Sequence, residues 1–335
     1  MKLTPGKLSG LKAVSNQHGV IAAAAMDQRG SLKKSLEKEK GSKITDHDME
    51  EFKSLVTEIL TQHASAILLD PEWGLPASKR RRNNAGLLLA YEKTGYDANT
   101  TGRLPDLLDH WSVQRLKEAG ADCIKILLYY TMTDGKDVND VKHAWVERIG
   151  DECRANDIPF FLECVGYEDG ADEKGPEFAK KKPQIVIDYM REFSKDKYGV
   201  DVLKVEVPVN MKFVEGSGVY AGTTAYSKKE AANYFKEASQ ATTKPFIYLS
   251  AGVSNAEFTE ALNFVAETGV KYNGVLCGRA TWKEGIAVYA KQGADAFRKW
   301  LETEGVKNIN AVNAALKGAT SWYEIYGVHE AVGAR

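Results

Sequence analysis

Residues 201–210, Asp-Val-Leu-Lys-Val-Glu-Val-Pro-Val-Asn, are the stretch that decides the fold. In an extended chain Lys204 and Glu206 lie on one face, and the other face carries Leu203, Val205 and Val207. Helical patterns flank this stretch, and a strand between helices belongs to a parallel sheet, where both faces are buried. Because burying an isolated charge is costly, Lys204 and Glu206 need a partner or a chemical task. We take chemistry as the better explanation.

Seven further runs have the composition of buried strands, and helical patterns separate them. With the opening stretch as the sixth, the expected strands cover 20–26, 66–69, 87–91, 123–128, 160–165, 246–250 and 274–278. The expected helices cover 46–63, 109–119, 138–156, 183–195, 228–240, 255–268, 284–302 and 309–316. This alternation, without a linker-like break, predicts an α/β fold: a single-domain (β/α)8 (TIM) barrel over 1–322 with a C-terminal helical extension, and a tail at 323–335. A doubly wound open sheet is the alternative, but no Gly-x-Gly-x-x-Gly follows the first strand.

Length and composition narrow the class of protein. A chain of 335 residues, 43% hydrophobic and 27% charged, has the composition of a soluble globular enzyme, and its net charge of −1 gives no reason to expect nucleic acid or an anionic membrane as a partner. The four cysteines show no Cys-x-x-Cys spacing, which is typical of buried thiols in a reducing compartment. No N-terminal leader or membrane span is evident, so we expect a cytoplasmic protein.

Polar residues gather where the expected strands end. Lys125 on the fourth strand, Glu163 on the fifth and Lys204 on the sixth are embedded among apolar neighbours, and Asp27 ends the first strand. The carboxyl ends of barrel strands meet at one mouth, so these side chains should lie together. A buried ion network that only stabilises the barrel is the structural alternative. Three such residues on consecutive strands favour catalysis.

Two lysines and a carboxylate in one pocket suit Schiff-base chemistry. A free lysine, with a pKa of about 10.4, is protonated at neutral pH and cannot attack a carbonyl. Desolvation and a second cation both lower that pKa, and Lys125 could supply the cation. An iminium between Lys204 and C2 of a ketose would accept the electrons of the C3–C4 bond. Glu163 is the candidate base for the C4 hydroxyl proton.

The last two strands predict an anion site. Each ends in small residues, Ser250-Ala251-Gly252-Val253 and Cys277-Gly278-Arg279-Ala280, which let backbone N–H groups approach a ligand. Arg279 adds a planar donor, and the loops after barrel strands seven and eight are the usual phosphate site. The six histidines are scattered without ligand spacing, so we expect no metal and no other cofactor.

Two further segments have open assignments. The basic cluster 79–82 is expected to be a solvated loop, with an anion-facing lid as the alternative. The segment 321–335 could dock on the barrel, cap the site or mediate a subunit contact.

Several blocks of the chain resemble a known family. The blocks are 26–30 (MDQRG), 68–76 (LLDPEWGLP), 87–97 (LLLAYEKTGYD), 201–210 (DVLKVEVPVN), 248–253 (YLSAGV) and 274–282 (GVLCGRATW). They closely resemble class I, metal-independent tagatose 1,6-bisphosphate aldolases over nearly the whole chain, to about Trp322. The resemblance implies a (β/α)8 barrel that cleaves a ketohexose bisphosphate to dihydroxyacetone phosphate and glyceraldehyde 3-phosphate.

By position, the resemblance makes Lys204 the Schiff-base lysine and Glu163 the proton-transfer carboxylate, with Lys125 and Asp27 in the same pocket. It also implies that Gln28 contacts substrate. The residues that it implies at a substrate phosphate are Ser250, Gly252, Gly278 and Arg279. The departures from the family pattern are 79–84, 216–224 and the tail after Trp322, and loops or tails at the mouth select the far end of a substrate.

Three alternatives stay open at this point. One is an aldolase for a related 1-phosphate, such as 6-deoxy-6-sulfofructose 1-phosphate. Another is a phosphosugar isomerase or decarboxylase without a Schiff base, in which Glu163 alone is the base and Lys204 only stabilises negative charge on the substrate. The third is a non-catalytic sugar-phosphate-binding regulator. In each case the expected partner is a small phosphosugar, and a homo-oligomer such as a dimer stays open.

Overall fold

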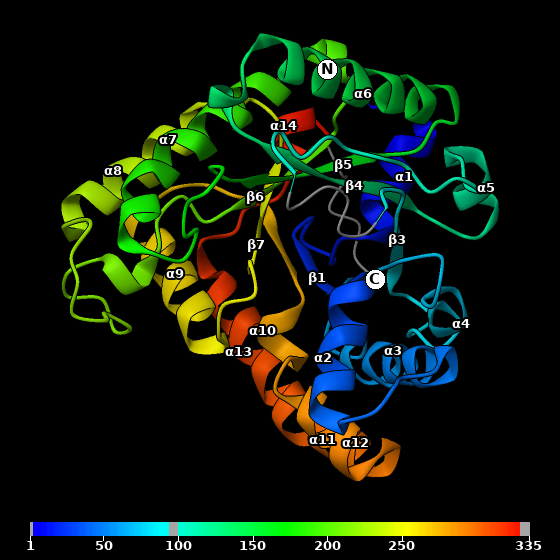
Figure 1. Cartoon of the computed structure of the whole chain (residues 1–335). Coiled ribbons are helices and arrows are strands. Elements are labelled where there is room, and N and C mark those ends of the chain that lie inside the picture. The colour runs from blue at the N-terminus through cyan, green and yellow to red at the C-terminus, as the bar shows by residue number, and fades with distance from the viewer. Residues whose placement is uncertain (1–2, 94–99, 329–335) are drawn as a thin grey trace.

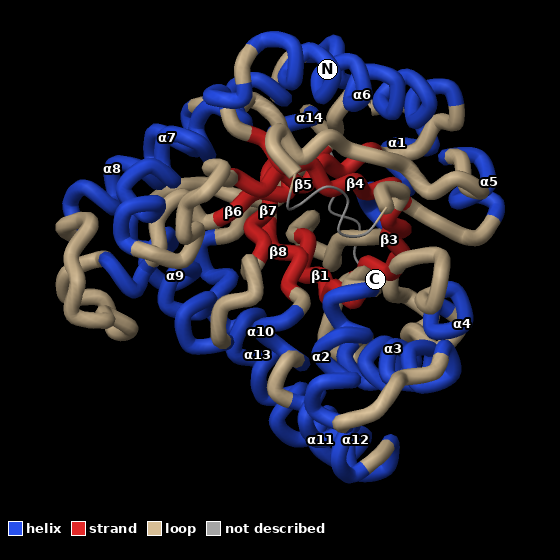
Figure 2. The backbone as a smooth tube through the Cα atoms, in the orientation of Figure 1, coloured by secondary structure: helices blue, strands red, loops and turns tan. Residues whose placement is uncertain are grey.

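The computed structural model describes residues 3–93 and 100–328. Within them, eight parallel strands close into a barrel in chain order, and the last strand pairs with the first. Helices surround the strands on the outside (Figures 1 and 2). The (β/α)8 prediction is therefore confirmed. The strands are β1 (Ile21–Met26), β2 (Ala66–Leu69), β3 (Gly86–Ala90), β4 (Cys123–Tyr130), β5 (Phe160–Gly166), β6 (Val202–Glu206), β7 (Phe246–Leu249) and β8 (Gly274–Cys277).

The helices follow the strands in the order that the barrel requires. They are α1 (Pro5–Ala13), α2 (Gly30–Lys40), α3 (Asp46–Leu60), α4 (Leu75–Ser78), α5 (Val113–Glu118), α6 (Lys136–Ala155), α7 (Pro176–Phe193), α8 (Lys228–Gln240), α9 (Asn255–Thr268), α10 (Arg279–Trp282), α11 (Gly285–Gln292), α12 (Ala294–Trp300), α13 (Val306–Ala315) and α14 (Tyr323–Tyr326). Short 3₁₀ turns cover Met132–Asp134, Asp196–Tyr198, Met211–Phe213 and Leu316–Gly318, and a π-helical turn, Leu301–Gly305, joins α12 to α13. In this part of the chain, none of the helices has both the length and the apolar character needed to span a membrane.

Strand side chains alternate between the barrel interior and the helix layer. A cluster inside the barrel takes every second residue, including Ile21, Ala23 and Ala25 of β1 and Val202 of β6. The residues between them pack against the helices, as Leu203 and Val205 do. By the same alternation Lys204 points inward, and its side chain is buried. The Glu206 carboxylate is also buried, but it contacts the helix layer: its Oε1 pairs with Lys182 of α7 (3.1 Å), and its Oε2 accepts a hydrogen bond from Gly166 N (2.7 Å). The predicted inward position is confirmed for Lys204 and is wrong for Glu206, which is the last residue of β6.

Three helix predictions need correction. The expected helix 183–195 begins earlier, at Pro176, and keeps Pro183 in its interior. A proline cannot bond the carbonyl four residues before it, and here that carbonyl, Ala179 O, accepts a hydrogen bond from the Tyr226 hydroxyl. The expected helix 109–119 starts only at Val113, because Ser112 caps it. The expected helix 284–302 is broken at Gly293, which has a φ of 83°.

The ends of the described chain close the amino-terminal end of the barrel. Leu11, at α1, joins the interior cluster together with Trp322 and Tyr326 of the C-terminal segment. The Trp322 indole donates a hydrogen bond to Ser15 Oγ (2.7 Å), and the Tyr326 hydroxyl donates to the carbonyl of Asp201 (2.6 Å), which precedes β6. The segment 321–328 therefore docks on the barrel, away from the mouth; residues 329–335 of the expected tail lie outside the described residues.

The basic cluster 79–82 also lies away from the mouth, because it comes just before β3. Arg81 donates hydrogen bonds to Ser78 O and Ala85 O, and Lys79 and Arg80 are exposed. A cluster at the amino-terminal end cannot cover a site at the carboxyl ends of the strands. The solvated-loop prediction is confirmed, and the anion-facing lid is wrong.

Candidate active site

A cluster of charged side chains fills the carboxyl end of the barrel. Lys125 of β4 is fully buried, and its Nζ donates hydrogen bonds to Asp27 Oδ2 and to Glu92 Oε1, both at 2.9 Å. Glu163 of β5 lies between the two lysines: its Oε2 is 2.8 Å from Nζ of Lys125 and 2.8 Å from Nζ of Lys204. These last two contacts are ion pairs whose angles fall outside hydrogen-bond geometry. The structure thus brings together the four residues that the sequence singled out.

Electrostatics fixes the protonation of the central groups. Burial raises the pKa of the Glu163 carboxyl, but Lys125 and Lys204 outweigh this effect, so the pKa lies below its usual range. Asp27 shows the same balance, and its pKa is also lowered. Burial lowers the pKa of Lys125, but three carboxylates outweigh it and raise that pKa well above normal. Lys125 is therefore a permanent cation, and Glu163 is ionised and able to accept a proton.

Sequence reasoning missed two residues of this cluster, Glu92 and Arg29. Glu92 lies two residues after Ala90 and continues the inward alternation beyond the end of β3. Arg29 is 1% exposed, and its Nη2 donates a hydrogen bond to the backbone carbonyl of Glu92 (2.6 Å). Its Nη1 pairs with Glu72 Oε2 (3.1 Å). Extending the alternation of β3 by one step would have found Glu92; Arg29 offered no such signal.

A buried lysine supports the loop that carries Asp27 and Gln28. Lys53 of α3 is fully buried, and its Nζ donates to Met26 O (2.8 Å), Gln28 O (2.7 Å) and Asp70 Oδ1 (2.5 Å). One cation therefore holds the carboxyl end of β1 against the end of β2. Gln28 Oε1 is buried and has no hydrogen-bond partner among the described residues, so it is available to a ligand.

The turn after β7 presents backbone rather than side chains. Ala251 and Gly252 have φ values of 47° and 75°, and Val253 N donates to Ser250 O (3.0 Å). Two consecutive left-handed residues closed by this bond form a type I′ turn. A Cβ at Gly252 would lie 2.7 Å from Cζ of Arg279, so only glycine lets the guanidinium lie against the turn.

The turn after β8 carries Arg279 itself, at the start of α10. A Cβ on Gly278 would lie 2.9 Å from Ala25 O and 3.5 Å from Gln28 Nε2, so the backbone of β8 packs closely on the end of β1. The Trp282 indole donates to Ala25 O (2.9 Å) and holds α10 in place. Arg279 itself is exposed to solvent. The predicted phosphate residues are therefore adjacent, around an exposed guanidinium.

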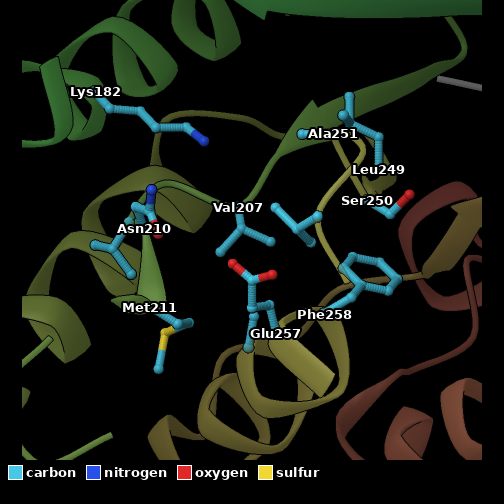
Figure 3. Close-up of a pocket in the computed structure, with 12 residues that line it drawn as sticks. Lys182, Val207, Asn210, Met211, Leu249, Ser250, Ala251, Glu257 and Phe258 are labelled. Atoms are coloured by element: carbon cyan, nitrogen blue, oxygen red, sulfur yellow. The ribbon is translucent and has the colours of Figure 1, made fainter. Parts of the chain in front are cut away.

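A separate pocket of about 60 Å³ lies behind the β7 turn (Figure 3). It shares Ser250 and Ala251 with the turn, while Lys182 and Glu257 point toward it from α7 and α9. None of the four charged residues that the sequence singled out lines it. Lys182 is already paired with Glu206 Oε1 (3.1 Å). We therefore place the candidate active site at the charged cluster and not in this pocket.

Comparison with known proteins decides the family. The model of the DeoC/LacD family aldolases matches residues 21–284, which contain the whole barrel. The chain belongs to this family. Family membership confirms the prediction that the chain is an aldolase, a lyase that cleaves carbon–carbon bonds.

Named relatives of the family match almost end to end. The chain is 55% identical over 332 residues to tagatose 1,6-diphosphate aldolase 2 of Enterococcus faecalis, an alignment that covers 98% of this chain and 99% of the relative. It is 54% identical over 318 residues to tagatose 1,6-diphosphate aldolase of Staphylococcus aureus, an alignment that covers 94% of this chain and 97% of that relative. The resemblance found in the sequence blocks is therefore confirmed.

Proposed function

We propose that this aldolase cleaves D-tagatose 1,6-bisphosphate, and related ketohexose bisphosphates, to dihydroxyacetone phosphate and glyceraldehyde 3-phosphate through a Schiff base on Lys204. The observation that carries the proposal is the single carboxylate oxygen of Glu163 that contacts the ammonium groups of both Lys204 and Lys125. The names of the relatives from E. faecalis and S. aureus support the choice of tagatose bisphosphate.

The substrate phosphate is expected between the turns after β7 and β8. Arg279 supplies a charged donor there, Ser250 a hydroxyl, and Gly252 and Gly278 a backbone without side chains. Lys204 stands on β6, the next strand to β7. A ketose held by its 1-phosphate therefore presents C2 to Lys204 and extends its far end across the mouth.

The reaction then follows from the charges. Lys204 gives up a proton to a neighbouring carboxylate and adds to C2, and loss of water forms the iminium. Glu163 removes the proton of the C4 hydroxyl, the C3–C4 bond breaks, the aldehyde leaves, and the electron pair moves to the iminium to form an enamine. Protonation at C3 and hydrolysis release dihydroxyacetone phosphate and restore Lys204. Lys125, a permanent cation, stabilises the negative charge that develops on the C4 oxygen.

A substrate panel tests this proposal. Initial rates of cleavage should be measured side by side for tagatose 1,6-bisphosphate, fructose 1,6-bisphosphate and 6-deoxy-6-sulfofructose 1-phosphate, with Lys204→Arg as the matched variant. We expect turnover of the bisphosphates and none by Lys204→Arg, because a guanidinium cannot form the imine. Preference for the sulfonate would reassign the substrate, and appreciable activity of Lys204→Arg would favour the isomerase or decarboxylase. The cytoplasmic location and the homo-oligomer stay predictions.

A further inference from the structure

Glu92 is a buried carboxyl in the active site to which the scheme above gives no task. Glu92 follows β3 at an inward-facing position and is 4% exposed. Its Oε1 accepts a hydrogen bond from Lys125 Nζ (2.9 Å). Lys125 already has two other carboxylate partners, Asp27 and Glu163. A third carboxylate is therefore not needed to neutralise this lysine.

The second oxygen of this carboxyl, Oε2, has no hydrogen-bond partner within residues 3–93 and 100–328, although the atom is buried. The neighbouring Arg29 does not bond to Oε2. Nη2 of Arg29 donates to the backbone carbonyl of Glu92 (2.6 Å) and lies 3.7 Å from Glu92 Oε1. Buried polar atoms without a partner are rare and costly. Oε2 is therefore the atom of this carboxyl that is open to a ligand.

The surroundings of Glu92 shift the pKa of its carboxyl in the opposite direction from those of Asp27 and Glu163. Burial raises the pKa of Glu92 and the charge of Asp27 adds to the effect, while Lys125 and Arg29 oppose it without cancelling it. The pKa values of Asp27 and Glu163 are lowered instead. With Oε1 accepting from Lys125, a proton on Glu92 belongs on Oε2, where it can be donated to an oxygen of the substrate.

The order of strands says which part of the substrate reaches Glu92. In the closed barrel β3 stands opposite β7, with β4, β5 and β6 between them. The proposed phosphate site is at β7 and β8, the Schiff-base lysine is on β6 and the base is on β5. A sugar that starts at this phosphate and passes Lys204 and Glu163 therefore carries its C4–C6 half over β4 and toward β3.

We propose that Glu92 binds a hydroxyl group of the C4–C6 half of the sugar through Oε2 while it positions Lys125 through Oε1. This inference rests on the aldolase function proposed above. It makes Glu92 a residue for the aldehyde half of the substrate, whereas Lys204 and the phosphate turns serve the ketone half.

The test compares a complete substrate with its ketone half. Glu92→Ala and Glu92→Gln should be assayed for cleavage of tagatose 1,6-bisphosphate, and for trapping of dihydroxyacetone phosphate by borohydride, followed by intact mass. Loss of one buried hydrogen bond should lower kcat/KM of Glu92→Ala by about 10- to 100-fold. Trapping of dihydroxyacetone phosphate should keep the wild-type rate, because that molecule lacks the half that Glu92 contacts. Glu92→Gln should recover much of the loss, since its amide N–H can donate to a substrate oxygen from the position of Oε2.

Glu72→Gln is the matched control. Glu72 contacts the same Arg29 (3.1 Å), but its side chain is 42% exposed, and we expect wild-type values in both assays. Equal loss of cleavage and trapping in Glu92→Ala would overturn the inference, and so would normal cleavage. A wild-type enzyme that forms no adduct would instead overturn the proposed Schiff base, so the two failures can be told apart.

Discussion

Replacing Lys125 by methionine should destabilise the protein in a way that depends on pH. Methionine has similar length and no charge, so little cavity is created, but Asp27, Glu92 and Glu163 lose the ammonium that all three contact within 2.9 Å. Breaking a buried ion pair on one side typically costs about 3–5 kcal/mol, because the remaining charge is left unpaired.

The pH dependence of this cost follows from the protonation of one buried carboxyl group. Protonating a carboxyl whose ordinary pKa is 4.5, as for Glu163, costs about 4 kcal/mol near pH 7.5 and about 0.7 kcal/mol near pH 5. In the wild type the pKa of Glu163 is lowered, so its stabilising contribution is present above the ordinary pKa and is lost only as the pH falls through the folded-state pKa. In Lys125→Met the Lys204 ammonium is left to serve three buried carboxyl groups, so we expect one of them to keep its proton above the ordinary pKa, and stability is then lost as the pH rises. The deficit should grow by about 3 kcal/mol between these two conditions.

Urea unfolding measures this deficit, and the six tryptophans supply the fluorescence signal. Midpoints and slopes should be recorded at pH 5, 6 and 7.5 after reversibility has been established. Lys180→Met is the control, because Lys180 pairs with Glu177 on the surface (2.8 Å, with side chains 52% and 82% exposed) and its loss should leave the midpoint nearly unchanged. A deficit that is the same at all three pH values would refute the unpaired-charge argument and indicate lost packing.

Three further predictions follow from the site. Glu163→Gln should lower kcat by about 10²-fold or more, as loss of a general base does, and a steady-state assay with near-wild-type turnover would contradict that role. Arg279→Ala should mainly raise KM, since it removes phosphate binding, and an unchanged KM would move the phosphate elsewhere. The four free cysteines are buried and burial raises the pKa of each thiol, for Cys277 to about 12, so a thiol reagent should label the chain only after unfolding; rapid labelling of native protein would contradict this.

The barrel and the centre of its site could be predicted because both depend on local pattern. A period of two along an apolar strand assigns each residue to a face, so Lys125, Glu163 and Lys204 were recognisable as inward charges from sequence alone. The contacts among these three side chains could not be predicted from the sequence. The closure of the barrel, and not the sequence spacing, brings Nζ of Lys125 and Nζ of Lys204 to the same oxygen of Glu163.

The errors have equally specific causes. Proline is common at the start of a helix, so the sequence predicts that a helix begins at Pro183. In the structure the Tyr226 hydroxyl satisfies the carbonyl that this proline leaves free, and such a long-range partner cannot be read from sequence. Glu92 was overlooked because the strand was ended at Tyr91, one residue before the next inward position. The position of the basic cluster 79–82 follows from the fold: a segment that precedes a strand lies at the end of the barrel away from the mouth.

The intact mass of the enzyme after incubation with dihydroxyacetone phosphate and borohydride tests the central claim most directly. The proposal predicts one stable adduct per chain, on the peptide that contains Lys204, and none in Lys204→Arg. Folded enzyme that binds the phosphate without gaining mass, or an adduct on Lys125 instead, would contradict the claim that Lys204 is the Schiff-base nucleophile.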